Sequence, residues 1–421
     1  MSKSKFSRRS FLKSAAIGTA GLALGNMLRM PMSVRAQSGT INYWHHFTSD
    51  AEFAGMEEVI KLFNAKYPDI QIVQENIPNA DFMAKFTAAV QADSRPNTAM
   101  VTADRVLDMV AMGGLIDLTD RVKNWDLKKY FPDSRFDGVT VDGKIYGVPS
   151  FTFVDWCYYR KDYFEEAGIA APPTTYQEFQ DAAIKLTDAS KNRYGFGMRG
   201  GDGGQGFIID AIQAFGSELV VDGKAAIDKA KAMDAIKFWS ELFTVHKVVP
   251  PSAPNDSFRQ IMDAFKTGQT AMVWHHTGSL AEITAALGDK FGTYVRPKGP
   301  KAQIARVSFQ YNGMMKDENA DAAWDWLAFW GESDAAITFL EKTGYFPVSE
   351  AVATDPRITS NSAYDAAVAT QKFGILPPRF IGYAGWAQKV VLPEFQKVLI
   401  GGQSVEQCVD TIIKELEKAL A

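Results

Sequence analysis

Short β-rich runs alternate with longer helical patterns along the chain from about residue 40. Runs of alternating or continuous apolar residues at 40–47, 70–77 and 98–104 predict three strands. Between them, segments 52–69 and 81–94 place apolar residues three and four positions apart, which predicts two amphipathic helices. The order strand, helix, strand, helix, strand predicts a parallel sheet with helices on both faces.

A second unit of the same kind follows a predicted hairpin turn, "VDGK" at 141–144. Its predicted elements are a strand at 156–164, a helix at 174–187 capped by Thr175, a strand with a glycine-rich loop at 194–207, helices at 232–245 and 257–269, and a strand at 270–276. The sequence therefore predicts two α/β units, each with its own loops after its strands.

Polar residues follow several of the predicted strands. The pair His45–His46 ends the first strand, and the pair Asp104–Arg105 follows the third. Because ligands in such sheets bind beyond the carboxyl ends of the strands, these loops are expected to share one rim. The loops at 200–206 and 275–279 take the same position in the second unit, so the sequence "WHH" occurs once per unit at an equivalent place.

The two histidine pairs account for four of the five histidines in the chain. Adjacent residues on an extended segment point to opposite faces, so at most one histidine of each pair is expected to face a cleft. We favour His46 and His276, which are closer to the loops. A neutral imidazole donates with one nitrogen and accepts with the other, which suits the hydroxyl groups of a polyol.

The composition is that of an ordinary globular protein. A chain of 421 residues with 46% hydrophobic and 22% charged residues can bury a large core, and its length predicts two domains. The formal net charge of −4, with no block of basic residues in the body of the chain, argues against a nucleic-acid partner. No GxSxG, HExxH or P-loop motif is present, so no enzyme activity is expected. The enzymatic alternative is a periplasmic hydrolase that uses a histidine and Asp104 as general acid and base.

Residues 1–36 have the features of a twin-arginine export signal. Arg8 and Arg9 precede a mildly apolar stretch that ends in a small-residue cleavage site. We expect a soluble periplasmic protein without a lipid anchor, because no cysteine lies at the cleavage point. Cys157 and Cys408 are the only cysteines, and two such isolated thiols are more often buried apolar residues than a disulfide.

Eight motifs in order carry a family resemblance that runs from about Thr40 to the C-terminus. They are "YW…F", "LFNAKYPDIQIV", "FTAAVQADSRPNTAMVTADR", "GLIDLTD", "GKIYGVP", "YYRKDYFEEAGIAAPPTTYQEF", "FKTGQTAMVWHHTGS" and "GYFPVSEAV". Together they resemble the family 1 extracellular solute-binding proteins of bacterial ABC importers, the group that contains maltose-binding protein. The resemblance implies an α/β, two-lobe periplasmic-binding-protein fold, each lobe a sheet flanked by helices, with the ligand cleft between the lobes.

The resemblance also implies how the chain divides and what it binds. The implied N-terminal lobe is 37–150 plus 310–345, the C-terminal lobe is 154–306 plus 348–421, and the hinge crossings lie near 151–154, 307–312 and 344–347. The implied ligand is a carbohydrate or glycoside, and the implied partners are the permease subunits of an ABC transporter in the inner membrane. We expect a monomer without a cofactor, in which hinge closure traps the ligand.

Ligand-binding residues are implied position by position. Asp104 and Arg105 match an acidic–basic pair that binds sugar hydroxyls, and 383–386 matches aromatic residues that stack on pyranose faces. Some relatives have a sugar-binding carboxylate at the position of Phe153, so Asp155 is a candidate replacement for it. The residues expected to contact ligand are Trp44, His45, His46, Asp104, Arg105, Phe151, Asp155, Gly201, Asp202, Trp274, His276, Gly278, Arg379, Tyr383 and Trp386.

Three alternatives remain open from the residues themselves. A core role is the alternative for Trp44 and Trp274, because both end apolar strands. The glycine-rich loop at 198–206 exposes backbone amides that suit an anion, so the alternative ligand is an anionic sugar derivative or a glycerol-phosphate-like solute. A zinc site made of one histidine from each pair and Asp104 would instead indicate a metal-binding receptor, which we favour less.

Overall fold

The computed structural model describes residues 39–370 and 372–421, so the predicted signal peptide lies outside the described residues. The first part of the chain forms β1 (Gly39–His45), α1 (Asp50–Lys66), β2 (Ile70–Asn76), α2 (Phe82–Gln91), β3 (Thr98–Thr102), α3 (Val106–Ala111), α4 (Thr119–Lys123), β4 (Thr140–Val141) and β5 (Lys144–Ile145). The middle part forms β6 (Val148–Arg160), α5 (Lys161–Glu166), α6 (Tyr176–Leu186), β7 (Tyr194–Gly197), α7 (Gln205–Ala214), β8 (Val220–Val221), β9 (Lys224–Ala225), α8 (Lys229–Thr244), α9 (Phe258–Lys266), β10 (Thr270–His276), α10 (Leu280–Leu287) and β11 (Phe291–Tyr294). The last part forms β12 (Ala305–Met314), α11 (Ala320–Phe329), α12 (Ser333–Thr343), α13 (Glu350–Ala353), α14 (Pro356–Thr359), α15 (Asp365–Thr370), β13 (Gly374–Ile375), α16 (Tyr383–Trp386), α17 (Leu392–Leu399) and α18 (Val405–Leu420).

The main sheet follows the predicted alternation and adds strands from distant parts of the chain. Its order is β2-β1-β3-β12-β6-β10-β7, with β11 paired to β6 and β13 to β12. β1 pairs in parallel with both β2 and β3, as the strand and helix order predicts. β12 pairs antiparallel with β3 and β6, a return of the chain that local periodicity does not predict.

Local sequence signals explain several element boundaries. Thr175 caps α6 through a capping box, in which its hydroxyl accepts from the backbone N–H of Glu178. The predicted hairpin turn joins β4 to β5, with Asp142 and Gly143 at φ values of 50° and 76°. Two positive φ values in succession define a type I′ turn, which the Asp-Gly dipeptide favours.

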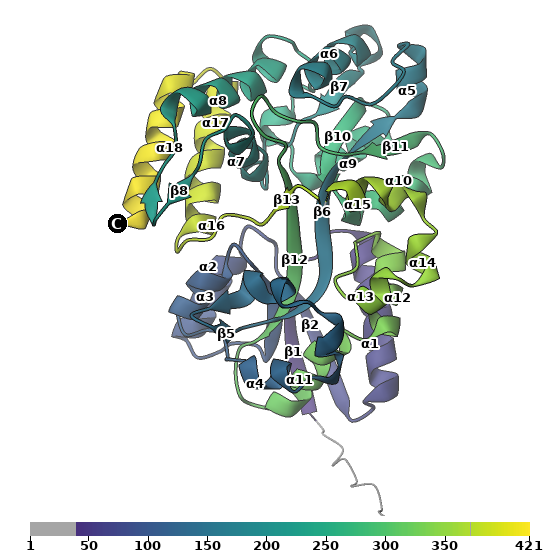
Figure 1. Cartoon of the computed structure of the whole chain (residues 1–421), viewed down its shortest axis with the longest axis vertical. Helices are drawn as coiled ribbons and strands as arrows, with labels where there is room; N and C mark the ends of the chain where they lie inside the picture. The colour runs from purple at the N-terminus through teal and green to yellow at the C-terminus, as the bar shows by residue number, and fades with distance from the viewer. Residues whose placement is uncertain (1–38, 371) are drawn as a thin grey trace, which may run out of the picture. The chain divides into compact units, whose positions relative to one another are not determined.

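β6 and β12 pass through both halves of the fold (Figure 1). The first part of β6 pairs with β12, and the part from Asp155 to Arg160 pairs with β10 and β11. Thr152 also exchanges two backbone hydrogen bonds with Phe346, at 2.8 and 3.1 Å. Three segments far apart in the sequence therefore lie side by side where the chain crosses between the halves.

The hydrophobic core forms two clusters, which lie on opposite faces of β6 and β10. Along β6, Trp156 and Tyr158 belong to the first cluster and Cys157 to the second, because successive side chains of a strand alternate between faces. The first cluster includes β1, β2 and β3 with α1 and α12, and continues onto one face of β10. The second cluster packs the other face of β10 against α6, α7, α8, α17 and α18.

Both cysteines, Cys157 and Cys408, are buried and free. Burial raises the pKa of each thiol, so neither is a reactive thiolate at neutral pH. Among the helices in the described part of the chain, none is long and apolar enough to span a bilayer.

Candidate ligand-binding site

Two neighbouring cavities open between the halves of the fold. We call the first, of about 300 Å³, the Asp104 chamber. The residues that line this chamber alone include Thr102, Asp104, Arg105, Asp155, Gln205, Asp210, Arg306, Ser308, Tyr383 and Gln388. We call the second, of about 380 Å³, the Arg259 chamber. The residues that line this chamber alone include His46, Phe47, Thr48, Glu52, Asp202, Ser257, Arg259, Gly278 and Tyr345. Six residues line both chambers and form what we call the neck: Asn79, Phe153, Arg199, Gly203, His275 and His276.

Strand ends supply much of this lining, as the sequence predicts. Thr102 ends β3, His46 follows β1, and Asn79 lies in the loop after β2. From the other half, Arg199 follows β7 and His276 ends β10. The loops after two sets of parallel strands therefore face each other, which is where α/β sheets bind ligands.

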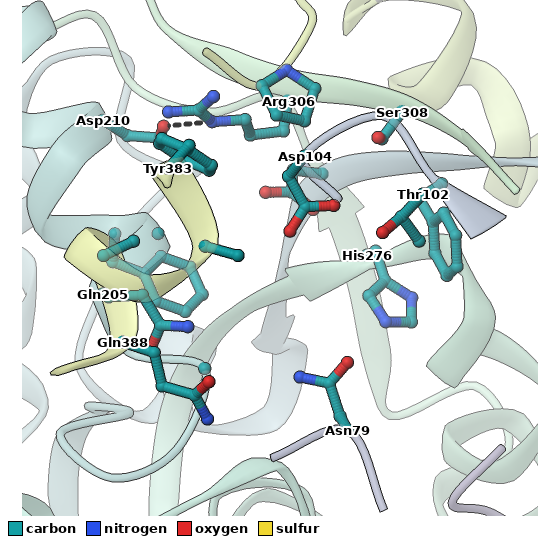
Figure 2. A pocket seen from close by; sticks show the side chains of 18 of the residues that line it. Asn79, Thr102, Asp104, Gln205, Asp210, His276, Arg306, Ser308, Tyr383 and Gln388 are labelled. Carbon is teal, nitrogen blue, oxygen red and sulfur yellow. Dashed lines mark hydrogen bonds and ion pairs between the residues drawn. The ribbon is translucent and has the colours of Figure 1, made fainter. Parts of the chain in front are cut away.

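A four-membered charge cluster lies at one end of the Asp104 chamber. Nη2 of Arg296 lies 3.3 Å from Oδ2 of Asp155 and 3.8 Å from Oδ2 of Asp210. Nε of Arg306 donates to Oδ1 of Asp210 (Figure 2). Burial raises the pKa of Asp155, and Arg296 opposes that rise. Two carboxylates compensate two guanidinium groups, so these four residues hold each other in place.

Asp104 and Arg105 are different, because both keep unused hydrogen-bonding capacity. The Asp104 carboxylate, which points into the open space of its chamber (Figure 2), forms no hydrogen bond or ion pair with the described residues. Nη2 of Arg105 donates to the backbone and side-chain oxygens of Asn79 at 3.2 and 2.6 Å. Nε and Nη1 of Arg105 are buried without a partner among the described residues, and burial lowers its pKa.

A hydrogen bond from the backbone fixes the tautomer of His276 at the neck. Nδ1 of His276 accepts from the backbone N–H of Gly278 at 3.1 Å. A neutral ring with an accepting Nδ1 carries its proton on Nε2, which is then free to donate to a ligand. Burial, reinforced by the charges of Arg199 and Arg259, lowers the pKa of His276 to about 3.

The two histidines of the first pair have different surroundings, since His45 lies in the core and His46 lines a cavity. His45 is buried, and its ring bonds the side chains of Gln74 and Asn76 at 3.1 and 3.3 Å. His46 lines the Arg259 chamber, and its Nδ1 has no partner among the described residues. Burial and the charge of Arg105 lower the pKa of His46 to about 3. Burial also lowers the pKa of His45, to about 4, so both rings are neutral at physiological pH.

The charged groups of the Arg259 chamber are mostly satisfied by protein neighbours. Glu52 accepts from the Tyr345 hydroxyl at 2.6 Å and from the backbone N–H groups of Thr48 and Ser49, just before α1. Arg259 makes two bonds to Glu282, at 3.0 and 3.3 Å. Its guanidinium also lies over the Phe258 ring, whose centroid is 4.0 Å away.

Eight of the fifteen predicted ligand-binding residues line a chamber. These are His46, Asp104, Arg105, Asp155, Asp202, His276, Gly278 and Tyr383. The second histidine pair differs from the expectation that only one ring faces the cleft, because His275 also lines the neck. The chain turns into a short 3-10 helix directly after His276, and the two rings lie with centroids 4.0 Å apart.

The other seven predicted residues line neither chamber. Trp44 and Trp274 end apolar strands and pack in the core, with the Trp274 indole donating to the Tyr294 hydroxyl at 3.2 Å. Trp386 is also buried and donates to a backbone carbonyl of α18. Arg379 instead donates to two backbone carbonyls beside β4. The remaining three are His45, which is bonded within the core, Phe151, which stacks on Tyr345, and Gly201, which is closed off by the backbone at Asn255.

Several wall residues were not predicted. Asn79 and Arg199 follow predicted strands, so the strand-end rule that selected Asp104 could have selected them. Arg306 and Ser308 lie within β12, whose place in the sheet depends on long-range pairing, and no local signal marks them. Within residues 39–370 and 372–421, no group of three or more histidine, cysteine, aspartate or glutamate side chains is arranged to hold a metal ion.

Comparisons with known proteins agree with this geometry. Residues 48–337 match the model of the bacterial extracellular solute-binding proteins. A binding protein of Brucella abortus (strain 2308) is 24% identical over 340 residues, which cover 79% of this chain and 81% of the relative. The lactose-binding protein of Rhizobium radiobacter is 25% identical over 319 residues, covering 74% and 71%. An ABC transporter solute-binding protein of Thermotoga lettingae, solved with α-D-tagatose, has a TM-score of 0.84 and 23% identity and covers 91% of this chain and 100% of its own. The α/β fold predicted from the sequence is confirmed, and the chain belongs to the bacterial extracellular solute-binding protein family.

Proposed function

We propose that this protein binds a carbohydrate or polyol in the two chambers and delivers it to the permease subunits of an ABC importer. The observation that carries the proposal is the unpartnered Asp104 carboxylate beside Arg105, in a chamber whose other two carboxylates, Asp155 and Asp210, are paired with arginines. A carboxylate accepts hydroxyl protons and a guanidinium donates to hydroxyl oxygens, so the pair matches vicinal hydroxyl groups. The lactose and tagatose named for the two relatives above belong to this class of ligand.

Ligand capture is proposed to close the cleft by hinge motion. The lobes would be 37–150 plus 310–345 and 154–306 plus 348–421, and both contribute walls to each chamber. The hinge would lie where β6, β12 and the segment around Phe346 run side by side. Only the closed form lets both walls contact one ligand, so ligand binding favours that form.

The ligand is proposed to be released unchanged, without catalysis and without a cofactor, by a monomeric periplasmic protein. Export would use residues 1–36 as a twin-arginine signal. Replacing Arg8 and Arg9 with lysine should leave precursor in the cytoplasm, because that export route depends on the guanidinium pair. Normal export of this double variant would indicate the general secretory route instead.

A thermal-shift screen of sugars, sugar alcohols and glycosides tests the binding proposal. A ligand at a thousandfold excess over its Kd adds about 4 kcal/mol to the free energy of unfolding. The compound that stabilises the protein should also lower the radius of gyration in small-angle scattering, and it should be recovered chemically intact. Binding without compaction would contradict the hinge, and conversion of the compound would indicate an enzyme.

A further inference from the structure

Among the arginines that line the chambers, Arg105 and Arg199 have no carboxylate of the described residues within ion-pairing distance, and only Arg199 also has both terminal nitrogens free of hydrogen bonds to those residues. Arg306 pairs with Asp210, and Arg259 pairs with Glu282. Burial lowers the pKa of Arg199 to about 10, so the group remains a cation at neutral pH.

The loop after β7 holds this guanidinium in a fixed place. Nε of Arg199 donates to the backbone carbonyl of Asp202 at 2.6 Å. Gly203 has a φ of 85°, and a Cβ at that position would collide with Nη2 of Arg199. The glycine therefore serves both the left-handed turn and the close approach of the guanidinium. The Asp202 carboxylate instead accepts from the Gln388 side chain at 3.2 Å, so it does not pair with Arg199.

On the Arg259 side of the neck, the carboxylates that line the chamber are Asp202 and Glu52. The charge of Asp202 opposes the lowering of the Arg199 pKa by burial, but the Asp202 carboxylate lies beyond ion-pairing distance and bonds Gln388. The His276 ring is neutral, and the charges of both Arg199 and Arg259 lower its pKa, so both guanidinium groups lie near this ring. Glu52 is held by Tyr345 and by the backbone just before α1. The Asp104 chamber differs, because there the unpartnered group is the Asp104 carboxylate.

We propose that the ligand is a polyol or sugar that carries an anionic group, with its hydroxyls in the Asp104 chamber and its anion on Arg199 at the neck. This inference rests on the proposed function. A carboxylate or phosphate accepts two parallel hydrogen bonds from a guanidinium fork and compensates its charge when the cleft excludes water. A neutral hydroxyl would leave this cation without a direct anionic partner in the closed cleft, which is costly.

Matched pairs of probes separate charge from shape. Titration calorimetry at fixed ionic strength would compare glucose with glucuronate and with glucose 6-phosphate, galactose with galacturonate, and glycerol with glycerol 3-phosphate. We expect the anionic member of at least one pair to bind at least about tenfold more tightly than the neutral member. The carboxylate and phosphate arms identify which anion the site prefers.

Three variants test whether Arg199 causes that preference. Arg199→Gln should reduce the ratio of affinities to less than about twofold, and Arg199→Lys should restore part of it, because lysine keeps the charge but lacks the fork. Arg357→Gln removes an exposed arginine that pairs with Asp355, and it should keep the wild-type ratio. Thermal unfolding of each free variant separates loss of the fold from loss of the anion site.

The possible failures are distinguishable. A wild-type preference for the neutral members, or an unchanged ratio in a folded Arg199→Gln variant, would overturn this inference and leave the proposed function standing. Absence of binding by all these probes and by every compound of the thermal-shift screen would reject the proposed function, and this inference with it.

Discussion

The two chambers are built from similar residue types but use their charges differently. In the Asp104 chamber, Asp210 compensates Arg306 and Arg296, and Asp104 alone among its carboxylates has no partner in the described part of the chain. In the Arg259 chamber, Glu52 and Arg259 have protein partners, and the guanidinium at the shared neck lacks one. A charge that is already paired maintains the shape of a chamber, whereas an unpaired charge is available to a ligand.

The largest effect is expected from breaking a paired charge. Asp210→Asn keeps the size of the side chain but leaves Arg306 and Arg296 with only the carboxylate of Asp155. Removing one partner from a buried ion cluster costs about 3–5 kcal/mol, which should appear as a lower free energy of unfolding in urea. The matched variant Asp104→Asn should change the free energy of unfolding by less than about 0.5 kcal/mol. Equal destabilisation by both variants would show that Asp104 is also structural.

The second-largest effect is expected from removing the unpaired charge of Asp104, and it concerns the free energy of ligand binding rather than that of unfolding. Asp104→Ala removes a charged acceptor of ligand hydroxyls, and the loss of hydrogen bonds to a charged group should cost about 1.5–3 kcal/mol of binding free energy. Calorimetry with the stabilising compound from the thermal-shift screen measures this loss. Unchanged affinity in a folded Asp104→Ala variant would show that the ligand does not contact this carboxylate.

The rule that ligands bind beyond the carboxyl ends of parallel strands predicted where the site lies better than it predicted which residues line it. It placed His46 and Asp104 at one rim, and His276 at the equivalent place in the second unit, because the position of a strand end depends on local periodicity. It could not separate Trp44 and Trp274 from the cleft, since the face on which a strand-end side chain lies depends on the packed sheet.

Residues from distant segments were harder to predict. Tyr383 and Trp386, on the short helix α16, both belong to the second core cluster, but only Tyr383 also lines the Asp104 chamber. Arg306 reaches the chamber only because β12 returns between β3 and β6. The antiparallel insertion of β12 requires long-range pairing, which no local sequence pattern encodes.

A smaller effect separates His46 and His276, which line the cleft, from His45, which does not. His46→Ala and His276→Ala should each weaken binding by about 0.5–1.5 kcal/mol, the net contribution of one neutral hydrogen bond. His45→Ala should leave affinity unchanged and lower stability, because its ring bonds Gln74 and Asn76 inside the protein. Calorimetry and urea unfolding on the three variants distinguish these outcomes. A weaker ligand complex in the His45 variant would contradict this division.

The smallest expected effect is that of pH on affinity, and it follows from the same burial. The pKa values of His46 and His276 are lowered to about 3, so both rings stay neutral and keep one donor and one acceptor between pH 8 and pH 6. Affinity should therefore change little over this range, whereas an unshifted histidine with a pKa near 6.5 would be mostly protonated at pH 6 and would lower affinity by up to about fourfold.

The free energy of unfolding, in contrast, should depend on pH below about 6.5. Because each folded pKa lies below the unfolded value, the unfolded state takes up protons first, and the free energy of unfolding falls as pH drops from about 6.5 toward 3, by up to about 1.4 kcal/mol per pH unit per histidine. Calorimetry at pH 8 and pH 6, with urea unfolding from pH 7 to pH 4, tests both statements. A several-fold loss of affinity at pH 6 would show that a cleft histidine becomes protonated near that pH and that its charge weakens ligand binding.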